Sequence, residues 1–185
     1  MIVLILTIIG LGLIMFNLLY RQVYYKAVNS PKQLAIHCLV FVLVSAFMFY
    51  IGYLTASSLV HHIGFAGHWL SMLIFFFLGM KMYKDSHNYK TSKSTFNTDS
   101  FKVLALFVFA HSFDFFIAGI SLGFYYHYPN WIFLAFVLSM LFFIIMSYVM
   151  ARRQTATLSV WLFSVAGSVI VGMNVFVILA LWLVR

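Results

Sequence analysis

The sequence predicts an all-α, polytopic membrane protein with six transmembrane helices, and three observations lead to this fold class. The chain of 185 residues is 65% hydrophobic and only 8% charged, whereas about a quarter of the residues in an ordinary soluble domain are charged. Its mean hydropathy is +1.06. The apolar runs are also too long and too continuous for the strands of an outer-membrane barrel, which alternate over about ten residues. Helices that face lipid are therefore the predicted building blocks.

Each predicted helix is an apolar run that is long enough, or nearly so, to cross a hydrocarbon core of about 30 Å, which takes roughly 20 residues. In chain order the predicted spans are 1–20, 34–55, 67–83, 101–126, 131–151 and 158–184. The first span has no basic segment before it, which favours a retained span over a cleaved signal peptide. The third span is the shortest. The two prolines, Pro31 and Pro129, fall in connections, where helices should stop.

The basic residues predict the orientation of these spans. If the spans alternate, the first, third and fifth connections lie on one side of the membrane. That side receives ten of the eleven basic residues: Arg21, Lys26, Lys32, Lys81, Lys84, Lys90, Lys93, Lys102, Arg152 and Arg153. Short loops rich in Lys and Arg face the cytoplasm, so both termini are predicted to lie outside. Because orientation explains the net charge of +8, no nucleic-acid partner is expected.

The chain is predicted to be a single membrane domain, 1–185, built from two halves. A polar segment, 84–100, separates a first half, 1–83, from a second half, 101–185. Three spans in each half mean that the halves enter the membrane from opposite faces, which predicts an inverted repeat. Inverted repeats are a common construction of secondary transporters, whose substrate site lies near the membrane midplane.

One acidic residue lies inside a predicted span. The chain has no glutamate, and two of its three aspartates, Asp85 and Asp99, fall in the polar segment; the third, Asp114, lies within the apolar "AHSFDFFIAGISLGF". A charge at the bilayer centre costs about 2.5–3.5 kcal/mol on insertion scales, and such residues are usually functional. His111, three residues earlier, lies on the same helical face. This pattern predicts a cation or proton site; the alternative is a protonated aspartate that only bonds another helix.

Other polar side chains in the spans are candidates for secondary ligands. These are Asn17, Ser45, Ser139, Ser147, Ser164, Ser168 and Asn174. For each of them alone, hydrogen bonding between helices is the simpler interpretation. Gly119 and Gly123 form a pair of small residues that allows a neighbouring helix to approach closely.

Few other motifs suggest chemistry. His61, His62 and His68 have no adjacent carboxylate and give only a weak metal-binding pattern. A single cysteine, Cys38, cannot form an intramolecular disulfide. No phosphate-binding loop, hydrolase triad or pair of catalytic carboxylates is recognisable, so the chain is not expected to be an enzyme.

Three segments resemble the MntP-type manganese efflux pumps of the LysE-like transporter superfamily. "AHSFDFFIAGISLGF" is similar to the fourth-span signature of that family, "GHWLSMLIFFFLGMKMYKDS" to its third span and "AGSVIVGMNVFVIL" to its sixth. By this resemblance Asp114 and Ser112 occupy functional positions. Ile14 stands where the family has an aspartate in span one, and Ser45 stands where it has a glutamate in span two.

The predicted function is export of a cation by a small secondary transporter in the cytoplasmic membrane of a bacterium. Asp114 is predicted to bind the ion and His111 to assist it, with Ser112, Asn17 and Asn174 as secondary ligands. No permanently bound cofactor is expected; the transported ion is Mn²⁺, as the resemblance implies, or another cation. Mn²⁺ prefers hard oxygen ligands, often with an imidazole. The expected partners are the lipid bilayer and a second copy in a homodimer.

One carboxylate neutralises a buried divalent ion incompletely, and this leaves three interpretations open. The chain transports a different or monovalent cation, or His111 and Asp114 form a proton-coupled site, or the chain no longer transports metal. Two other functions remain as well: a substrate-binding membrane subunit of a multi-component importer, and a non-transporting accessory protein.

Overall fold

The chain forms a bundle of α-helices. The computed structural model describes residues 2–24, 31–64, 66–91, 101–125, 129–153 and 157–183. Over these residues all regular structure is helical: α1 (Ile2–Tyr24), α2 (Pro31–Ile63), α3 (Ala66–Thr91), α4 (Phe101–Tyr125), α5 (Pro129–Arg152) and α6 (Thr157–Leu183). Residues 92–100 of the predicted linker and Arg185 lie outside the described residues. The predicted orientation depends on ten basic residues, and the side chains of most of them also lie outside the described residues.

Five of these helices are long and apolar enough to cross a membrane. The apolar stretches are Ile2–Tyr20, Cys38–Val60, Val108–Tyr125, Trp131–Arg152 and Ser164–Leu183. The predicted class, a polytopic helical membrane protein, is thereby confirmed. α3 is not among the five, and its second half carries charged residues, including Lys81, Lys84 and Asp85. A sixth span in α3 therefore stays a prediction.

Helices α2 and α3 extend furthest beyond the predicted limits. α2 continues to Ile63, where Gly64 follows it with a φ of 55°. The amide of Gly64 donates to the carbonyl of Val60 at 2.9 Å, and glycine tolerates this left-handed conformation because it has no Cβ. α3 continues to Thr91, so residues 84–91 are helical although the sequence assigns them to the linker. Pro31 and Pro129 begin α2 and α5, positions at which no backbone donor is needed.

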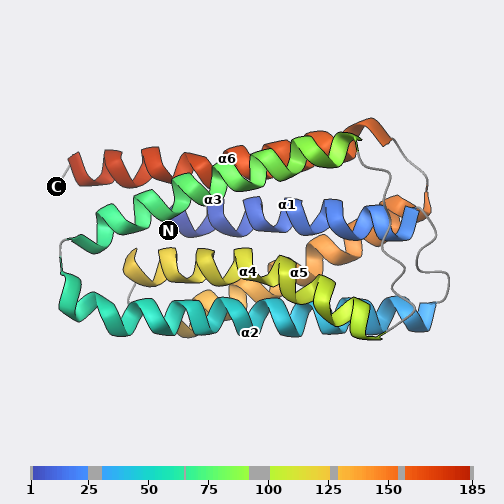
Figure 1. Cartoon of the computed structure of the whole chain (residues 1–185), viewed down its shortest axis with the longest axis horizontal. Coiled ribbons are helices and arrows are strands. Elements are labelled where there is room, and N and C mark those ends of the chain that lie inside the picture. Colours follow the sequence, from blue (N-terminus) through green and yellow to red (C-terminus); the bar gives the residue numbers. More distant parts are fainter. Residues whose placement is uncertain are drawn as a thin grey trace.

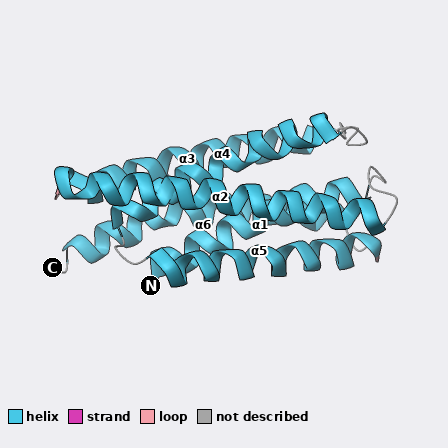
Figure 2. Cartoon of the chain, turned by 90° about the horizontal axis from the view of Figure 1, so that it is seen from below, coloured by secondary structure: helices cyan, strands magenta, loops and turns pink. Residues whose placement is uncertain are grey.

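The helices run along a common long axis, as Figures 1 and 2 show from two directions. α2 packs along α4, and α1 packs on both α5 and α6. α3 packs mainly on α6 and also contacts α4. Both chain ends lie toward the same end of the bundle (Figure 1). The side of the membrane that this end faces stays a prediction.

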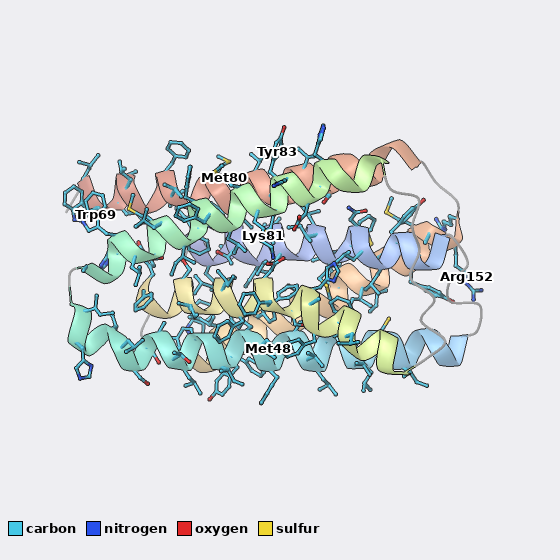
Figure 3. All side chains as sticks on the ribbon, in the orientation of Figure 1. Met48, Trp69, Met80, Lys81, Tyr83 and Arg152 are labelled. Atoms are coloured by element: carbon cyan, nitrogen blue, oxygen red, sulfur yellow. The ribbon has the colours of Figure 1, made fainter. Side chains whose placement is uncertain are left out.

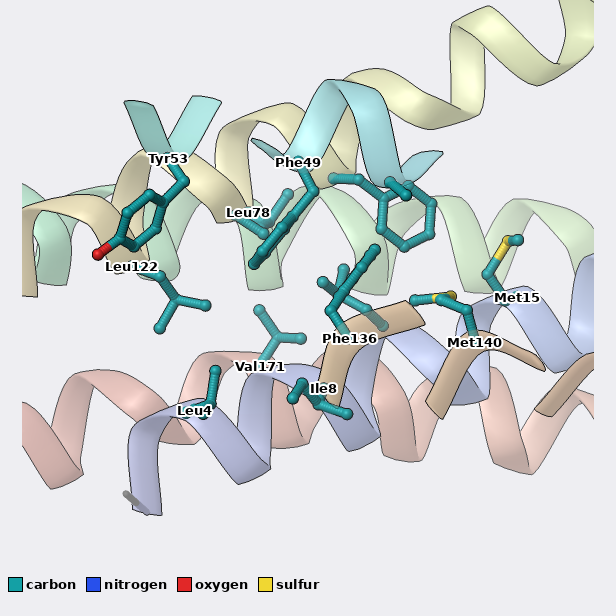
Figure 4. Close-up of a cluster of buried hydrophobic side chains, with 14 of the residues drawn as sticks. Leu4, Ile8, Met15, Phe49, Tyr53, Leu78, Leu122, Phe136, Met140 and Val171 are labelled. Atoms are coloured by element: carbon teal, nitrogen blue, oxygen red, sulfur yellow. The ribbon is translucent and has the colours of Figure 1, made fainter. Parts of the chain in front are cut away.

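Apolar side chains from several helices fill the interior, as Figure 4 shows. At its centre the rings of Phe49 from α2 and Phe136 from α5 are stacked, with centroids 4.1 Å apart and planes 4° from parallel. Met15 of α1 and Val171 of α6 are fully buried members of the same cluster. Large apolar side chains also cover the outside, such as Phe176, which is 73% exposed. An apolar exterior over an apolar core is the arrangement that lipid tolerates.

Candidate ion site between α3 and α4

Asp114 lies near the middle of α4 and is paired with a lysine. Its carboxylate oxygen Oδ1 accepts a hydrogen bond and forms an ion pair with Nζ of Lys81, which comes from α3. The Asp114 side chain is 13% exposed and the Lys81 side chain 46% exposed. Figure 3 shows Lys81 on the side of α3 that faces α4. The carboxylate is thus sheltered between the two helices, and the lysine reaches it from a more open position.

Two further ionisable residues flank this pair. Asp85 follows Lys81 by four residues on α3, and His111 precedes Asp114 by three residues on α4, so each lies one helical turn from its neighbour. Both side chains are half-buried, and both interact electrostatically with Asp114. Two helices therefore bring two carboxylates, an ammonium and an imidazole to one region of the bundle.

Ser112 lies on a different face of α4. Two residues along a helix correspond to a rotation of about 200°, so Ser112 faces α2 while Asp114 faces α3. Its hydroxyl is 3.2 Å from the hydroxyl of Ser45, and both serines are fully buried. Ser45 holds the position at which the resembled family has a glutamate. That position thus lies against α4, where two neutral hydroxyls bond each other.

Asn174 and Asn17 lie at the contacts of α1 with its neighbours. Nδ2 of Asn174 in α6 donates to the hydroxyl of Thr7 in α1 at 3.0 Å. Asn17 follows Phe16, whose carbonyl accepts a hydrogen bond from Ser147 of α5 at 3.0 Å. Among the described residues, the side-chain oxygens of Asn17 and Asn174 are buried and have no hydrogen-bond partner. Each asparagine thus presents an acceptor oxygen that the described part of the chain leaves unsatisfied.

The remaining polar side chains mostly serve packing. Ser139 and Ser168 donate to carbonyls of their own helices, at 2.8 Å and 2.7 Å. The hydroxyls of Ser86 in α3 and Ser164 in α6 are 2.6 Å apart. The ring of His68 packs edge-on against Tyr125, with centroids 5.5 Å apart.

The ion-binding arrangement that the sequence predicts is only partly assembled in this conformation. Within the described ranges there is no group of three or more His, Cys, Asp or Glu side chains that could hold a metal ion. His111 and Asp114 do lie on one face of α4, as predicted. A divalent ion at Asp114 therefore requires neutral oxygens, water or a rearrangement of side chains to complete its ligands.

Sequence reasoning missed Lys81 and Asp85 as members of this site. It counted Lys81 only among the charges of the cytoplasmic side and placed Asp85 in the polar segment, whereas the structure pairs Lys81 with Asp114 and places Asp85 within α3. The correction has a physical reason: a carboxylate inside apolar helices needs a counter-charge, and Lys81 follows an apolar run directly. The four-residue spacing from Lys81 to Asp85 was the available signal that both face the same way.

Taken together, these observations define a polytopic helical membrane protein with an ion pair between two of its helices. The chain belongs to the family described as "Putative manganese efflux pump", whose model matches residues 28–178. The family predicted from the third, fourth and sixth spans is thereby confirmed.

Curated relatives carry the same description. The chain is 36% identical over 84 residues to manganese efflux pump MntP proteins, named as putative, of two Bacteroides fragilis strains, a match that covers 45% of this chain and 43% of each relative. It is 33% identical over 90 residues to the protein of that name from Bacteroides thetaiotaomicron, covering 49% of this chain and 47% of the relative. The chain thus matches less than half the length of these relatives. No solved structure matches it.

Proposed function

We propose that this protein is a secondary transporter that exports a divalent cation of the manganese type through a site centred on Asp114. Family membership supports the transport of manganese. The observation that carries the location of the site is the ion pair of Asp114 with Lys81. Midway along an apolar helix, the Asp114 carboxylate already holds a positively charged group, which is the interaction that a transported cation requires.

The chemistry of the neighbouring side chains suits this ion. The oxygen of Asp114 is a hard, charged ligand, and His111 on the same helical face adds an imidazole, a combination that Mn²⁺ accepts. The unsatisfied oxygens of Asn17 and Asn174 are secondary ligands for conformations in which α1 and α6 shift. Ser112 bonds Ser45 and acts mainly by positioning α4 against α2.

Alternating exposure of the site is the mechanism that we propose, with the two three-helix halves as an inverted repeat. If α1, α2 and α3 correspond to α4, α5 and α6, the contact of α2 with α4 corresponds to that of α5 with α1. The contact of α1 with α6 likewise corresponds to that of α4 with α3. Both corresponding pairs pack against each other, which supports the repeat. Movement of one half against the other then opens a midplane site to each side in turn.

The proposed setting is the cytoplasmic membrane of a bacterium, with both termini outside. The curated relatives come from bacteria, and the clustering of basic residues in alternate connections supports this orientation. The energy source in this proposal is an ion gradient.

One alternative function has an observation in its favour. Ile14 and Ser45 replace two carboxylates of the resembled family, and Lys81 neutralises the remaining one. A chain that has lost transport and retains the fold as an accessory membrane protein would also show this arrangement. The two functions differ in whether the charge of Asp114 matters to cellular metal content.

The test is the manganese content of a manganese-sensitive bacterium that lacks its own exporter. We expect cells that express the protein to hold less manganese than cells with an empty vector, and we expect Asp114→Asn to remove the difference. Ser139→Ala is the matched control, because Ser139 bonds only a carbonyl of its own helix in the structure, and it should export normally. Membrane levels of each variant are measured by immunoblot. Equal export by Asp114→Asn and the parent rules out Asp114 as the transport site.

A further inference from the structure

The ion pair between Lys81 and Asp114 is asymmetric. The carboxylate is 13% exposed, whereas the lysine side chain is 46% exposed. A lysine carries a compact charge at the end of a flexible four-carbon stem. The packing of α4 against α3 holds the carboxylate in place, while the ammonium has room to leave it.

A second carboxylate lies within reach of the same lysine. Asp85 is one helical turn beyond Lys81 on α3 and is half-buried. The helix itself is anchored on α6: a Cβ on Gly79 would lie 2.9 Å from the Cα of Gly172, and Ser86 bonds Ser164. Because the backbone of α3 is held in this way, the ammonium can pass from Asp114 to Asp85 by a movement of the Lys81 side chain alone.

We propose that Lys81 is a tethered cation that competes with the transported ion for Asp114 and moves to Asp85 when the ion binds. This inference rests on the proposed function, because it requires Asp114 to be the ion-binding carboxylate. Without an ion, Asp114 and Lys81 form a neutral pair. With an ion bound to Asp114, the ammonium pairs with Asp85, so that no charge inside the bundle is left without a partner.

Competition with a lysine makes Lys81 a specificity-determining residue. A monovalent cation brings the same charge as the ammonium that it has to displace, and it gains nothing in charge by the exchange. A divalent cation interacts with the carboxylate about twice as strongly at the same distance, because Coulomb energy follows the product of the charges. Lys81 therefore favours ions such as Mn²⁺ over sodium and potassium at Asp114.

The test measures Mn²⁺ binding to the full-length protein in lipid nanodiscs by electron paramagnetic resonance, in which the signal of free aqueous Mn²⁺ falls on binding. Titrations are made in potassium chloride and in N-methylglucamine chloride at the same ionic strength, so that screening stays constant. The variants are Lys81→Gln, Lys81→Arg, Asp85→Asn and the double variant Lys81→Gln with Asp85→Asn. Lys84→Gln is the matched control, because Lys84 is an exposed lysine of the same helix.

We expect the parent and Lys84→Gln to bind Mn²⁺ equally well in both salts. Lys81→Gln should bind roughly tenfold more tightly and should become sensitive to potassium. Asp85→Asn should bind several-fold more weakly, and most of that effect should vanish in the Lys81→Gln background. Lys81→Arg should also bind more weakly, because a guanidinium pairs with a carboxylate through two parallel hydrogen bonds.

Different results overturn different parts of the inference. Weaker binding by Lys81→Gln, or binding that ignores potassium, overturns the competition. If Lys81→Gln does not insert, unchanged binding by Lys81→Arg overturns it instead. An equal effect of Asp85→Asn in both backgrounds overturns the transfer to Asp85. Asp114→Asn separates the two proposals: if it binds Mn²⁺ like the parent, the proposed site and the role of Lys81 both fail. If it loses binding while Lys81→Gln gains none, only the role of Lys81 fails.

Discussion

At the scale of single residues, two kinds of polar contact join α3 to α4, and they differ in what they can do. Lys81 and Asp114 are charged, and one partner is half exposed, so their contact can be exchanged for a contact with an ion. Ser71 and Ser121 are neutral and fully buried. Their hydroxyls are 3.0 Å apart, and each lies within 3.0 Å of the other residue's carbonyl. The serine contact therefore holds α3 against α4, whereas the contact of Lys81 with Asp114 can open.

The serine contact predicts a measurable coupling between Ser71 and Ser121. In a double-mutant cycle of Ser71→Ala and Ser121→Ala, we expect a coupling of about 0.6 kcal/mol, the average for hydrogen bonds between membrane helices, and at most about 1.7 kcal/mol. The free energy of unfolding is measured by denaturation in mixed micelles. A cycle of Ser121→Ala with Ser139→Ala serves as the control, because Ser139 bonds its own helix and separate sites behave additively. Equal values in the two cycles would contradict the proposed contact.

At the scale of helices, close backbone contact determines how α2 and α4 pack. A Cβ on Gly119 would lie 2.2 Å from the carbonyl oxygen of Phe49, and a Cβ on Gly52 would lie 2.2 Å from that of Phe116. Both distances are far below normal contact, so each helix presents a glycine to the backbone of the other. Small residues at such contacts are typical of membrane helices, whose association depends on close packing.

Replacement of a glycine by alanine is therefore expected to destabilise the bundle at Gly119 but not at Gly172. Gly119→Ala should lower the free energy of unfolding by about 1–3 kcal/mol, the usual cost of overpacking, because backbone atoms cannot move aside cheaply. Gly172→Ala should change it by no more than about 0.5 kcal/mol, since a Cβ there meets nothing within 4 Å. Denaturation in mixed micelles measures both variants. A loss at Gly172 as large as that at Gly119 would show that glycine content, rather than helix approach, sets the stability.

The same helices show what could be predicted from the sequence and what could not. Gly119 and Gly123 were recognisable as a ridge for close approach because their spacing is local, and the structure confirms the approach. The sequence did not reveal that α2 is the helix that approaches, since partner choice depends on the packing of the whole bundle. The partner of Lys81 was missed for the same reason: Asp114 is 33 residues away, so no local pattern connects the two residues.

At the scale of the whole molecule, two apolar hollows lie between described helices, and neither includes the residues of the proposed ion site. An open groove of about 460 Å³ at the contact of α2 with α5 is lined by Leu43, Val44, Ala46, Phe47, Tyr50 and Phe133. A smaller one of about 90 Å³ is lined by apolar residues of α1 and α5. Neither of these two hollows is lined by Asp114 or Lys81. In the proposed cycle, movement of one half of the bundle against the other exposes Asp114 to each side of the membrane in turn.

The movement can be assigned to the two sides of the membrane only once the orientation of the bundle is known. The last prediction therefore concerns this orientation. The single native cysteine is replaced as Cys38→Ser, and one new cysteine is introduced at either end of the bundle, as His62→Cys near the end of α2 or Thr91→Cys at the end of α3. His62 is exposed, and neither substitution alters the Lys and Arg distribution that determines orientation. In intact cells, a membrane-impermeant maleimide should label the cysteine at position 62, and it should label the one at position 91 only after the cells are permeabilised. The reverse pattern would place both termini in the cytoplasm and would overturn the proposed orientation. Labelling at both positions in intact cells would show that the bundle does not have one fixed orientation.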